Sequence, residues 1–300
     1  MSGLTSAEIA SAFIASCADE IAAPKPGNVH VFAAGHAMEA AHFIASARVA
    51  APAIAAAGER LGPRIRNAVD ATFAEVGLNT NLGILLLCGP LAQAAEKQAG
   101  AELRNEVAET LANLDRRDAE EVYTAIRRAA PGGLGRADRY DVCDVPSISL
   151  LEAMREAADR DMIAKQYVTD FRDIFEIGTC TVAEMPLLGD TSAVALQIYL
   201  TFLAQFPDTH IIRKHGTDAA SAVMREARVF VERAAKEAGS AQFVADLLDF
   251  DGRLKARRLN PGTSADFTVA SLFAARLSGL LPVLSDENRA CSAGKPSGSS

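Results

Sequence analysis

The five histidines of the chain fall in two short clusters, and histidine transfers protons near neutral pH, binds metal ions and donates hydrogen bonds to phosphate. One cluster comprises His30, His36 and His42, and the other comprises His210 and His215. Each lies beside a charged, proline-containing segment, residues 24–27 for the first and residues 207–214 for the second. We therefore expect the two clusters to meet in one site.

Two further segments place polar side chains where a helix is expected to begin. Residues 77–83 read Gly-Leu-Asn-Thr-Asn-Leu-Gly and precede the longest apolar run of the chain. Residues 260–262 form a Pro-Gly turn, and Thr263 and Asp266 follow with the spacing of a capping box. The first N–H groups of a helix lack partners within the helix and bind anions. Both segments are candidate phosphate sites, and an ordinary cap or a solvent turn is the structural alternative.

Two charged segments complete the set. Lys25 lies between two prolines, so the backbone presents its ammonium group at a low entropic cost. Asp208, Arg213 and Lys214 flank the apolar pair at 211–212, and this pair indicates that the segment is partly buried. Because burial of a charge is costly without a partner, we expect these charged side chains to be paired. An exposed turn is the alternative in both cases.

The elements that must position these residues are helices. Thr5 with Glu8 and Ser149 with Glu152 have capping-box spacing, and residues 118–130 carry apolar side chains at helical intervals. Further helices are expected over 191–205, 217–238 and 265–281, and no segment shows the alternation of a strand. We predict an all-α fold: a single catalytic domain over residues 1–288, with a central buried helix around 84–87 and a phosphate-binding pocket at helix N-termini, followed by a disordered tail at 289–300.

Composition limits the partners. The net charge of −8, the absence of tryptophan and the lack of a basic stripe argue against nucleic-acid binding. No apolar stretch reaches about 20 residues, so no membrane span is expected. Five scattered cysteines and the absence of a basic signal region indicate a reducing cytoplasm. We expect small-molecule substrates, and a homodimer is left open. P-loop, dinucleotide-binding, zinc-protease and serine-hydrolase motifs are absent.

In this order along the chain, the segments resemble motifs of the triphosphoribosyl-dephospho-CoA synthase family. Residues 24–29 match its Pro-Lys-Pro-Gly-x-Val segment. Residues 79–83 resemble its Asn-Thr-His-Lys-Gly, residues 208–216 its Asp-Thr-Asn and Arg-Gly-Gly elements, and residues 260–266 its Ser-Pro-Gly-Gly-Ser-Ala-Asp. The resemblance spans nearly the whole chain.

The chain also departs from the family pattern. Asn81 and Leu82 replace a His-Lys pair, which removes one imidazole and one cation. Residues 35–38 match Gly-Ala-His-x-Asp-Met only in part, with Glu39 as the one substitute for the missing acid. These variants resemble a branch of the family found in methylotrophs and methanogens, which use pterin C1 cofactors.

The resemblance implies an all-α transferase that uses ATP and Mg²⁺, joins C1 of the ATP ribose to the 2′-hydroxyl of 3′-dephospho-CoA, and releases adenine. One alternative is a related nucleotide-dependent transferase with another small acceptor, such as one in tetrahydromethanopterin-type C1 cofactor biosynthesis. A second alternative is a catalytically inactive nucleotide-binding helical protein.

Residue type and position then give each candidate a role within this reaction. The catalytic candidates are His36 and Asp208, the ATP-binding candidates are Lys25, Asn79, Thr80, Arg213, Lys214, Thr263 and Ser264, and the Mg²⁺ candidates are Glu20 and Asp266.

Overall fold

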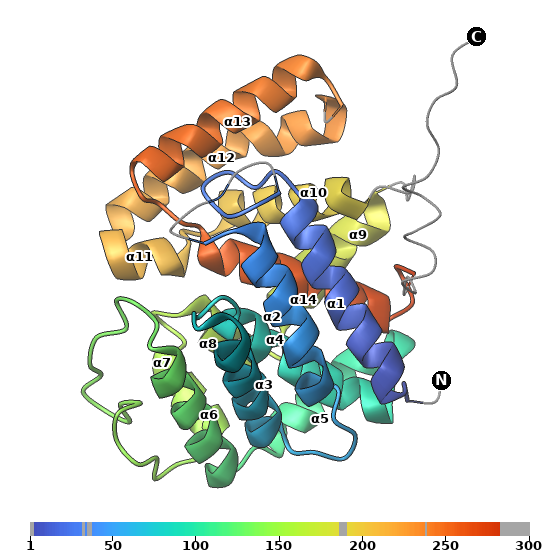
Figure 1. Cartoon of the computed structure of the whole chain (residues 1–300), viewed down its shortest axis with the longest axis vertical. Coiled ribbons are helices and arrows are strands. Elements are labelled where there is room, and N and C mark those ends of the chain that lie inside the picture. Colours follow the sequence, from blue (N-terminus) through green and yellow to red (C-terminus); the bar gives the residue numbers. More distant parts are fainter. Residues whose placement is uncertain (1–2, 32–33, 35–37, 186–190, 238, 283–300) are drawn as a thin grey trace.

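The structure is a computed structural model that describes residues 3–31, 34, 38–185, 191–237 and 239–282. Within these ranges the regular secondary structure is helical and no β-strand is present, which confirms the predicted all-α class (Figure 1). The α-helices are α1 (Ser6–Ala22), α2 (Ala40–Ile54), α3 (Leu61–Val76), α4 (Leu82–Lys97), α5 (Leu103–Ala112), α6 (Arg116–Ala129), α7 (Leu150–Ala157), α8 (Met162–Val168), α9 (Cys180–Glu184), α10 (Thr191–Gln205), α11 (Thr209–His215), α12 (Thr217–Glu237), α13 (Ala241–Ala256) and α14 (Gly262–Leu277), with a 3-10 turn at Gly100–Glu102 and a π-helical turn at Ile174–Thr179.

Two helices begin at the capping boxes expected from the sequence. The Thr5 hydroxyl accepts the Glu8 N–H at 3.3 Å, and the Glu8 carboxylate accepts the Thr5 N–H at 2.8 Å. Ser149 and Glu152 form the second expected capping box at the start of α7. The helices expected over 118–130, 191–205 and 217–238 are α6, α10 and α12. Local capping and the spacing of apolar residues thus predicted these helices correctly.

The start of α14 differs from the prediction. The helix begins at Gly262 instead of residue 265, and its N-cap residue Pro261 makes no side-chain cap. Thr263 and Asp266 are therefore the second and fifth residues of the helix, where they cannot form the expected capping box. A side chain from elsewhere in the chain caps this helix, as the site geometry shows.

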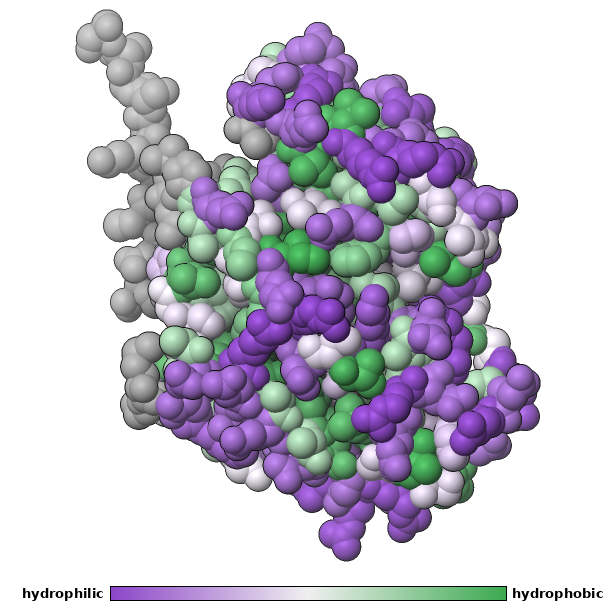
Figure 2. Space-filling view, turned by 180° about the vertical axis from the view of Figure 1, so that it is seen from behind, coloured by the Kyte–Doolittle hydropathy of each residue, from purple (hydrophilic) through white to green (hydrophobic). Residues whose placement is uncertain are grey.

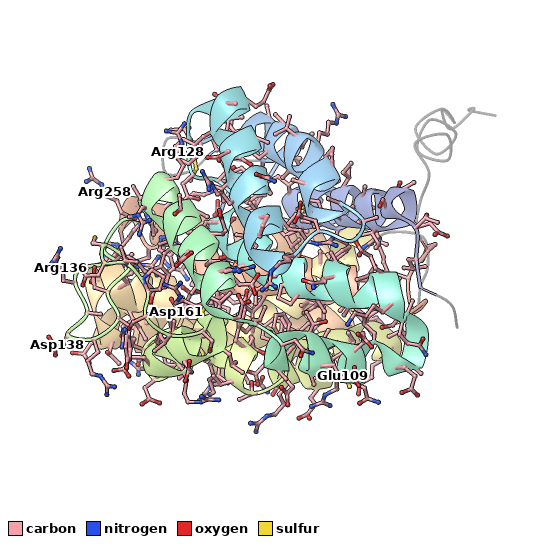
Figure 3. The ribbon with its side chains drawn as sticks, turned by 90° about the horizontal axis from the view of Figure 1, so that it is seen from below. Glu109, Arg128, Arg136, Asp138, Asp161 and Arg258 are labelled. Atoms are coloured by element: carbon pink, nitrogen blue, oxygen red, sulfur yellow. The ribbon has the colours of Figure 1, made fainter. Side chains whose placement is uncertain are left out.

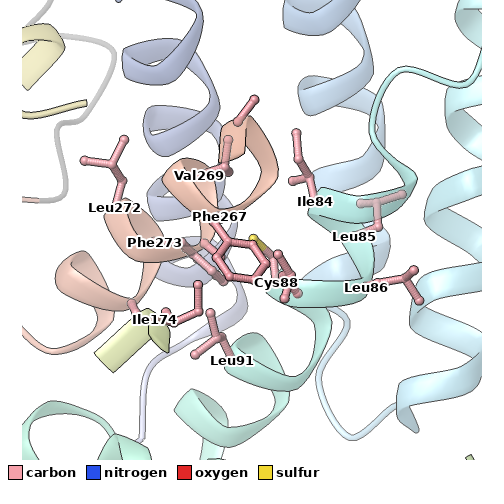
Figure 4. Packing of buried hydrophobic residues seen from close by; sticks show 14 of the residues in the cluster. Ile84, Leu85, Leu86, Cys88, Leu91, Ile174, Phe267, Val269, Leu272 and Phe273 are labelled. Carbon is pink, nitrogen blue, oxygen red and sulfur yellow. The ribbon is translucent and has the colours of Figure 1, made fainter. Parts of the chain in front are cut away.

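Helix α14 forms the centre of the molecule and contacts α1, α4, α10, α11 and the π-helical turn (Figure 1). Every residue of α14 except Asp266 is buried. The apolar run at 84–87 lies in α4 and is buried as predicted. Phe267 and Phe273 of α14 lie beside Cys88 and Leu91 of α4 (Figure 4). The chain therefore has two buried central helices, and Asp266 is the one residue of α14 that is not fully enclosed.

The outer helices cover this core. Helices α12 and α13 run side by side at the edge of the molecule (Figure 1), and the rings of Phe230 and Phe250 stack between them at 5.0 Å. On the face that Figure 2 shows, apolar residues form small patches separated by hydrophilic ones. No helix in the described part of the chain has the length and apolar character needed to span a membrane.

Candidate active site

A cavity of about 580 Å³ opens at the N-terminal ends of α4 and α14. Its wall is completed by residues from α6, α7, α8 and α11 and by the segment from Ala130 to Val142. This volume lies in the range of small-molecule sites. The Asn-Thr segment, the charged α11 segment and the start of α14 are far apart in the sequence, and the structure brings them to this one cavity.

Seven of the predicted site residues line the cavity, namely Glu20, Asn79, Thr80, Arg213, Lys214, Thr263 and Asp266. Lys25, Asp208 and Ser264 do not line it, and His36 lies outside the described residues. The three residues behind the wall are all engaged with other protein groups.

Asp208 is a helix cap in this structure. One carboxylate oxygen accepts the N–H groups of His210 and Ile211 at 2.9 and 3.2 Å, at the start of α11. The other accepts the N–H and the hydroxyl of Ser264 at 2.8 and 2.9 Å, at the start of α14. Burial raises the pKa of Asp208, and these hydrogen bonds oppose the rise. The carboxylate thus occupies the N–H and hydroxyl of Ser264 at the start of α14, which the sequence assigned to phosphate.

This geometry corrects two assignments. Ser264 has given both its donors to Asp208, so they are not available to a ligand. Asp208 accepts four hydrogen bonds away from the cavity, which leaves it poorly placed to take a proton from a substrate. Thr263 still lines the cavity, although its hydroxyl contacts the Thr209 hydroxyl at 3.0 Å and accepts the His210 N–H at 3.1 Å.

Lys25 is fully buried, contrary to its expected exposure on a rigid turn. Its ammonium group lies 2.7 Å from the Glu20 carboxylate and donates to the Val29 carbonyl at 2.7 Å. Burial lowers the pKa of Lys25 and raises that of Glu20, and the attraction between the two charges opposes both shifts. Since Glu20 lines the cavity, the lysine holds a carboxylate in place instead of contacting phosphate itself.

Asp266 has a carboxylate that receives no hydrogen bond or ion pair within the described residues. Its oxygen lies against Gly83 at the start of α4, where a methyl group would overlap it. Burial raises the pKa of Asp266 well above its usual value, the charges of Asp208 and Glu20 add to this, and Arg213 opposes it. An unpaired carboxylate that faces a cavity is suited to bind a cation or exchange a proton.

The cations of the cavity come from α11. Arg213 donates through Nε to the Gly132 carbonyl at 3.1 Å, and its guanidinium lies 3.7 Å from the Asp161 carboxylate. Partial desolvation and the neighbouring Arg213 lower the pKa of Lys214. Two adjacent cations at a cavity wall can hold the oxygens of a phosphate chain.

The Asn-Thr corner is largely used to hold its own backbone. The Thr80 hydroxyl donates to Ser46 at 2.6 Å, and the Asn81 amide donates to the Thr72 hydroxyl at 3.0 Å. The Asn79 side-chain oxygen accepts the Leu82 N–H at 3.2 Å. The Asn79 amide nitrogen, which no described hydrogen bond uses, is the group of this corner best able to reach a ligand.

The histidine clusters do not meet as expected. Of the described histidines, only His210 lines the cavity, packed against Gly262 at the start of α14. His30 is buried beside Asp251, His42 accepts the Glu39 N–H at the start of α2, and His215 is exposed. Glu39, the proposed substitute for the missing acid, does not line the cavity either. His30 lies in the segment after α1 and His42 in α2, whereas His210 and His215 share α11 but are not on the same face of it, so sequence proximity overestimated the convergence of the described histidines.

Sequence reasoning also missed three arginines that line the cavity, Arg136, Arg139 and Arg160. The first two follow the glycine-rich run at 132–135, to which no site role was assigned from the sequence. The usable signal was a run of glycines, typical of a loop, followed at once by two arginines. In the structure Gly133 has a positive φ of 78° and packs against Arg213.

A magnesium site is compatible with the donors present. Glu20 and Asp266 line the same cavity and offer the carboxylate oxygens that Mg²⁺ prefers. The described residues contain no group of three or more metal-ligating side chains. The protein would therefore supply two carboxylates, and phosphate oxygens and water would supply the other ligands.

Comparisons with known proteins give a consistent result. The model of a family described as ATP:dephospho-CoA triphosphoribosyl transferase matches residues 6–283. A crystal structure of a candidate triphosphoribosyl-dephospho-CoA synthase from Archaeoglobus fulgidus is 27% identical, with a TM-score of 0.61, over 79% of this chain and 100% of that one. A search of the curated proteins found no match.

The buried Glu20–Lys25 pair predicts an asymmetric stability response. Lys25→Met leaves a buried carboxylate without its cation and should lower the free energy of unfolding by about 3–5 kcal/mol, whereas Glu20→Gln with Lys25→Met should lower it much less. Urea denaturation measures both. Lys97 and Glu106 are the comparison pair, also 2.7 Å apart, but the Lys97 side chain is 54% exposed, so water can solvate the charges and Lys97→Met should cost clearly less than Lys25→Met. Equal losses for the two lysine variants would contradict the buried pair.

Proposed function

The chain belongs to the ATP:dephospho-CoA triphosphoribosyl transferase family, and from that premise we propose that it joins C1 of the ATP ribose to the 2′-hydroxyl of 3′-dephospho-CoA and releases adenine. The protein is a transferase of the triphosphoribosyl-dephospho-CoA synthase type. The observation that carries the finer proposal is the cavity in which the motif segments of the resemblance converge.

The triphosphate is held where the cations and the helix starts meet. Arg213 and Lys214 bind its oxygens, and Thr263 and the Asn79 amide add hydrogen bonds. Bound Mg²⁺ would neutralise part of the phosphate charge. Glu20 and Asp266 are the residues that would hold it, and Lys25 keeps Glu20 oriented toward the cavity.

The reaction moves two protons. The C1–N9 bond of ATP breaks, the C1–O2′ bond forms, the attacking hydroxyl loses a proton and the departing adenine gains one. The ribose passes through a cationic, oxocarbenium-like state, as in other glycosyl transfers. A group that exchanges protons near neutral pH must therefore lie in the cavity.

We assign this proton transfer to His210 in place of Asp208. Asp208 is committed to four hydrogen bonds, whereas the His210 ring lines the cavity beside Gly262. Asp208 and Thr263 hold the His210 backbone N–H, at 2.9 and 3.1 Å, so the imidazole is anchored at its base. Asp208 then acts on the reaction by positioning His210. His36 stays a prediction outside the described residues.

A second candidate, transfer of the nucleotide-derived group to another small acceptor, is favoured by one observation. Asn81 and Leu82 stand where the resembled motif has a His-Lys pair, and both side chains are nearly buried here. The cavity wall near the start of α4 therefore offers less charge than that motif would.

Adenine release decides between these candidates. With ATP, Mg²⁺ and dephospho-CoA, the chain should release one adenine for each acceptor consumed, measured by chromatography. Release only with a different acceptor would support the second candidate. If no acceptor leads to adenine release while ATP still raises the melting temperature of the protein, the chain is an inactive nucleotide-binding protein.

Replacing the imidazole should reduce turnover without loss of nucleotide binding. His210→Gln should lower the rate of adenine release by about 10²- to 10⁴-fold, the usual contribution of acid–base catalysis, and leave the Kd for ATP unchanged. His215→Gln is the matched control, because His215 is exposed on the same helix. A weakened Kd for ATP with unchanged turnover would show that His210 binds nucleotide instead.

The position of Asp266 is tested by Gly83→Ala. The added methyl group would overlap the Asp266 carboxylate and lie 2.9 Å from Ile163, so the carboxylate must move. A displacement of about 1 Å should lower the rate of adenine release by about 100-fold. Gly252→Ala in α13 has open space around it and should leave the rate unchanged. Equal rates in both variants would remove Asp266 from the reaction.

A further inference from the structure

The outer face of helix α13 carries no charged residue. Helices α12 and α13 lie side by side at the edge of the molecule (Figure 1), and the inner side of α13 buries Phe243, Leu247 and Phe250. The opposite side consists of exposed, uncharged residues, namely Ala241, Val244, Ala245, Leu248, Gly252 and Ala256. At about 100° of rotation per residue, these six fall within about one third of the helix circumference. We call them the α13 seam.

The seam resembles a helix face that packs against another element. Val244 and Leu248 are 39% and 41% exposed, and a methyl group on Gly252 would meet no other part of the chain within 4 Å. Other outer helices turn charge toward solvent, since Glu109 of α5 and Arg128 of α6 are exposed at the surface of the molecule (Figure 3). Apolar residues on two opposite sides are typical of a helix that packs on both. The seam is therefore a helix face without a partner among the described residues.

The charged residues along one edge of the seam are sorted by sign. Asp246 and Asp249 precede Arg253 and Arg257, and all four lie on the edge nearer α12, where Arg233 contacts Asp246 at 2.8 Å. The Asp249 and Arg253 side chains pair with each other but stay 70% and 48% exposed. The helix dipole does not account for the two acids, because they lie beyond the first turn of α13. This edge is therefore acidic toward the start of the helix and basic toward its end.

A second copy of the chain fits this pattern. In a two-fold pair, the two α13 helices run antiparallel and the same edge of each helix faces itself. The acidic part of one edge then lies beside the basic part of the other. An axis at the level of Phe250 also directs Leu248 of each copy to the open space at Gly252 of the second copy, and brings Asp249 near Arg253 of the second copy. Shape and charge thus favour the same arrangement.

We propose that the α13 seam is an interface between two copies of this chain, which pair antiparallel about a two-fold axis. The helix has 16 residues and offers about 24 Å of contact length. A pair of single helices buries less than the roughly 1,200–2,000 Å² of most stable complexes, so the pairing is weak and depends on concentration. No seam residue lines the cavity, so this interface does not depend on the proposed reaction.

The first test places a charge in the seam. Sedimentation equilibrium on the full chain should give a mean mass that rises with concentration from one chain toward two. Leu248→Glu should weaken the association by about tenfold or more, because the new carboxylate is buried in the interface without a cation. Val145→Glu is the matched control, since Val145 is 80% exposed outside the seam and gains the same charge without losing association.

Two results of this test would overturn the interface. One is the mass of a single chain at every concentration, which would mean that the seam fits a different partner or none. The other is equal association of the Leu248→Glu and Val145→Glu variants, which would place the contact elsewhere on the surface. The melting temperature at low concentration should be the same in both variants, because both positions are exposed.

The second test examines the direction of the pairing. Asp249→Arg and Arg253→Asp should each weaken the association, because like charges then meet across the axis. The double variant restores opposite charges at both positions and should associate like the unmodified chain. A double variant that stays as weak as the single variants would exclude the antiparallel arrangement. Single variants that associate normally would show that these charges do not meet across an axis, and would also overturn it.

Discussion

The rest of the site depends on the carboxylate of Asp208, because α14 is buried along nearly its whole length. A buried helix start leaves N–H groups that must find acceptors within the protein. Asp208 accepts the Ser264 N–H at the start of α14 and the N–H groups of His210 and Ile211 at the start of α11. One side chain thereby fixes the angle between two helix starts and places His210, Arg213 and Lys214 beside Thr263 and Asp266.

A second buried carboxylate, that of Glu20, is held by an ion pair with Lys25. The turn from Pro24 to Val29 is anchored from three sides: Tyr199 donates to the Pro26 carbonyl at 2.6 Å, Gly27 donates to Asp251 at 2.8 Å, and Asn28 donates to Asn260 at 2.8 Å. Lys25 is thus brought under the cavity and paired with Glu20. Rigid packing holds the cation, and the cation in turn orients the acid, so the proline-flanked lysine acts through its neighbour.

Features that depend on neighbouring residues in the sequence, such as helix starts, were predicted correctly. Features that depend on contacts between distant segments were not. Capping boxes at Thr5 and Ser149, and the helical periodicity of 118–130, depend on residues within one turn of each other, and these predictions are confirmed. The burial of Lys25 depends on Glu20 and on helices more than 170 residues away, since Tyr199 and Asp251 close over the turn. The capping of α14 by Asp208 joins residues separated by 56 positions. No local pattern carries that information, and no local pattern shows that the loop with Arg136 and Arg139 folds onto the cavity.

The structure changes the interpretation of Asn81 and Leu82, which replace the His-Lys pair of the resembled motif. From the sequence alone, this replacement removes an imidazole and a cation from a phosphate site. In three dimensions the start of α4 and helix α11 line the same cavity, and α11 contributes the imidazole of His210 and the cations of Arg213 and Lys214. Coulomb attraction and proton transfer depend on the distance to the substrate and not on which helix carries the group. The loss at α4 therefore does not leave the cavity without an imidazole or cations, because α11 places His210, Arg213 and Lys214 on its wall while the wall next to Gly83 carries neither of the replaced groups.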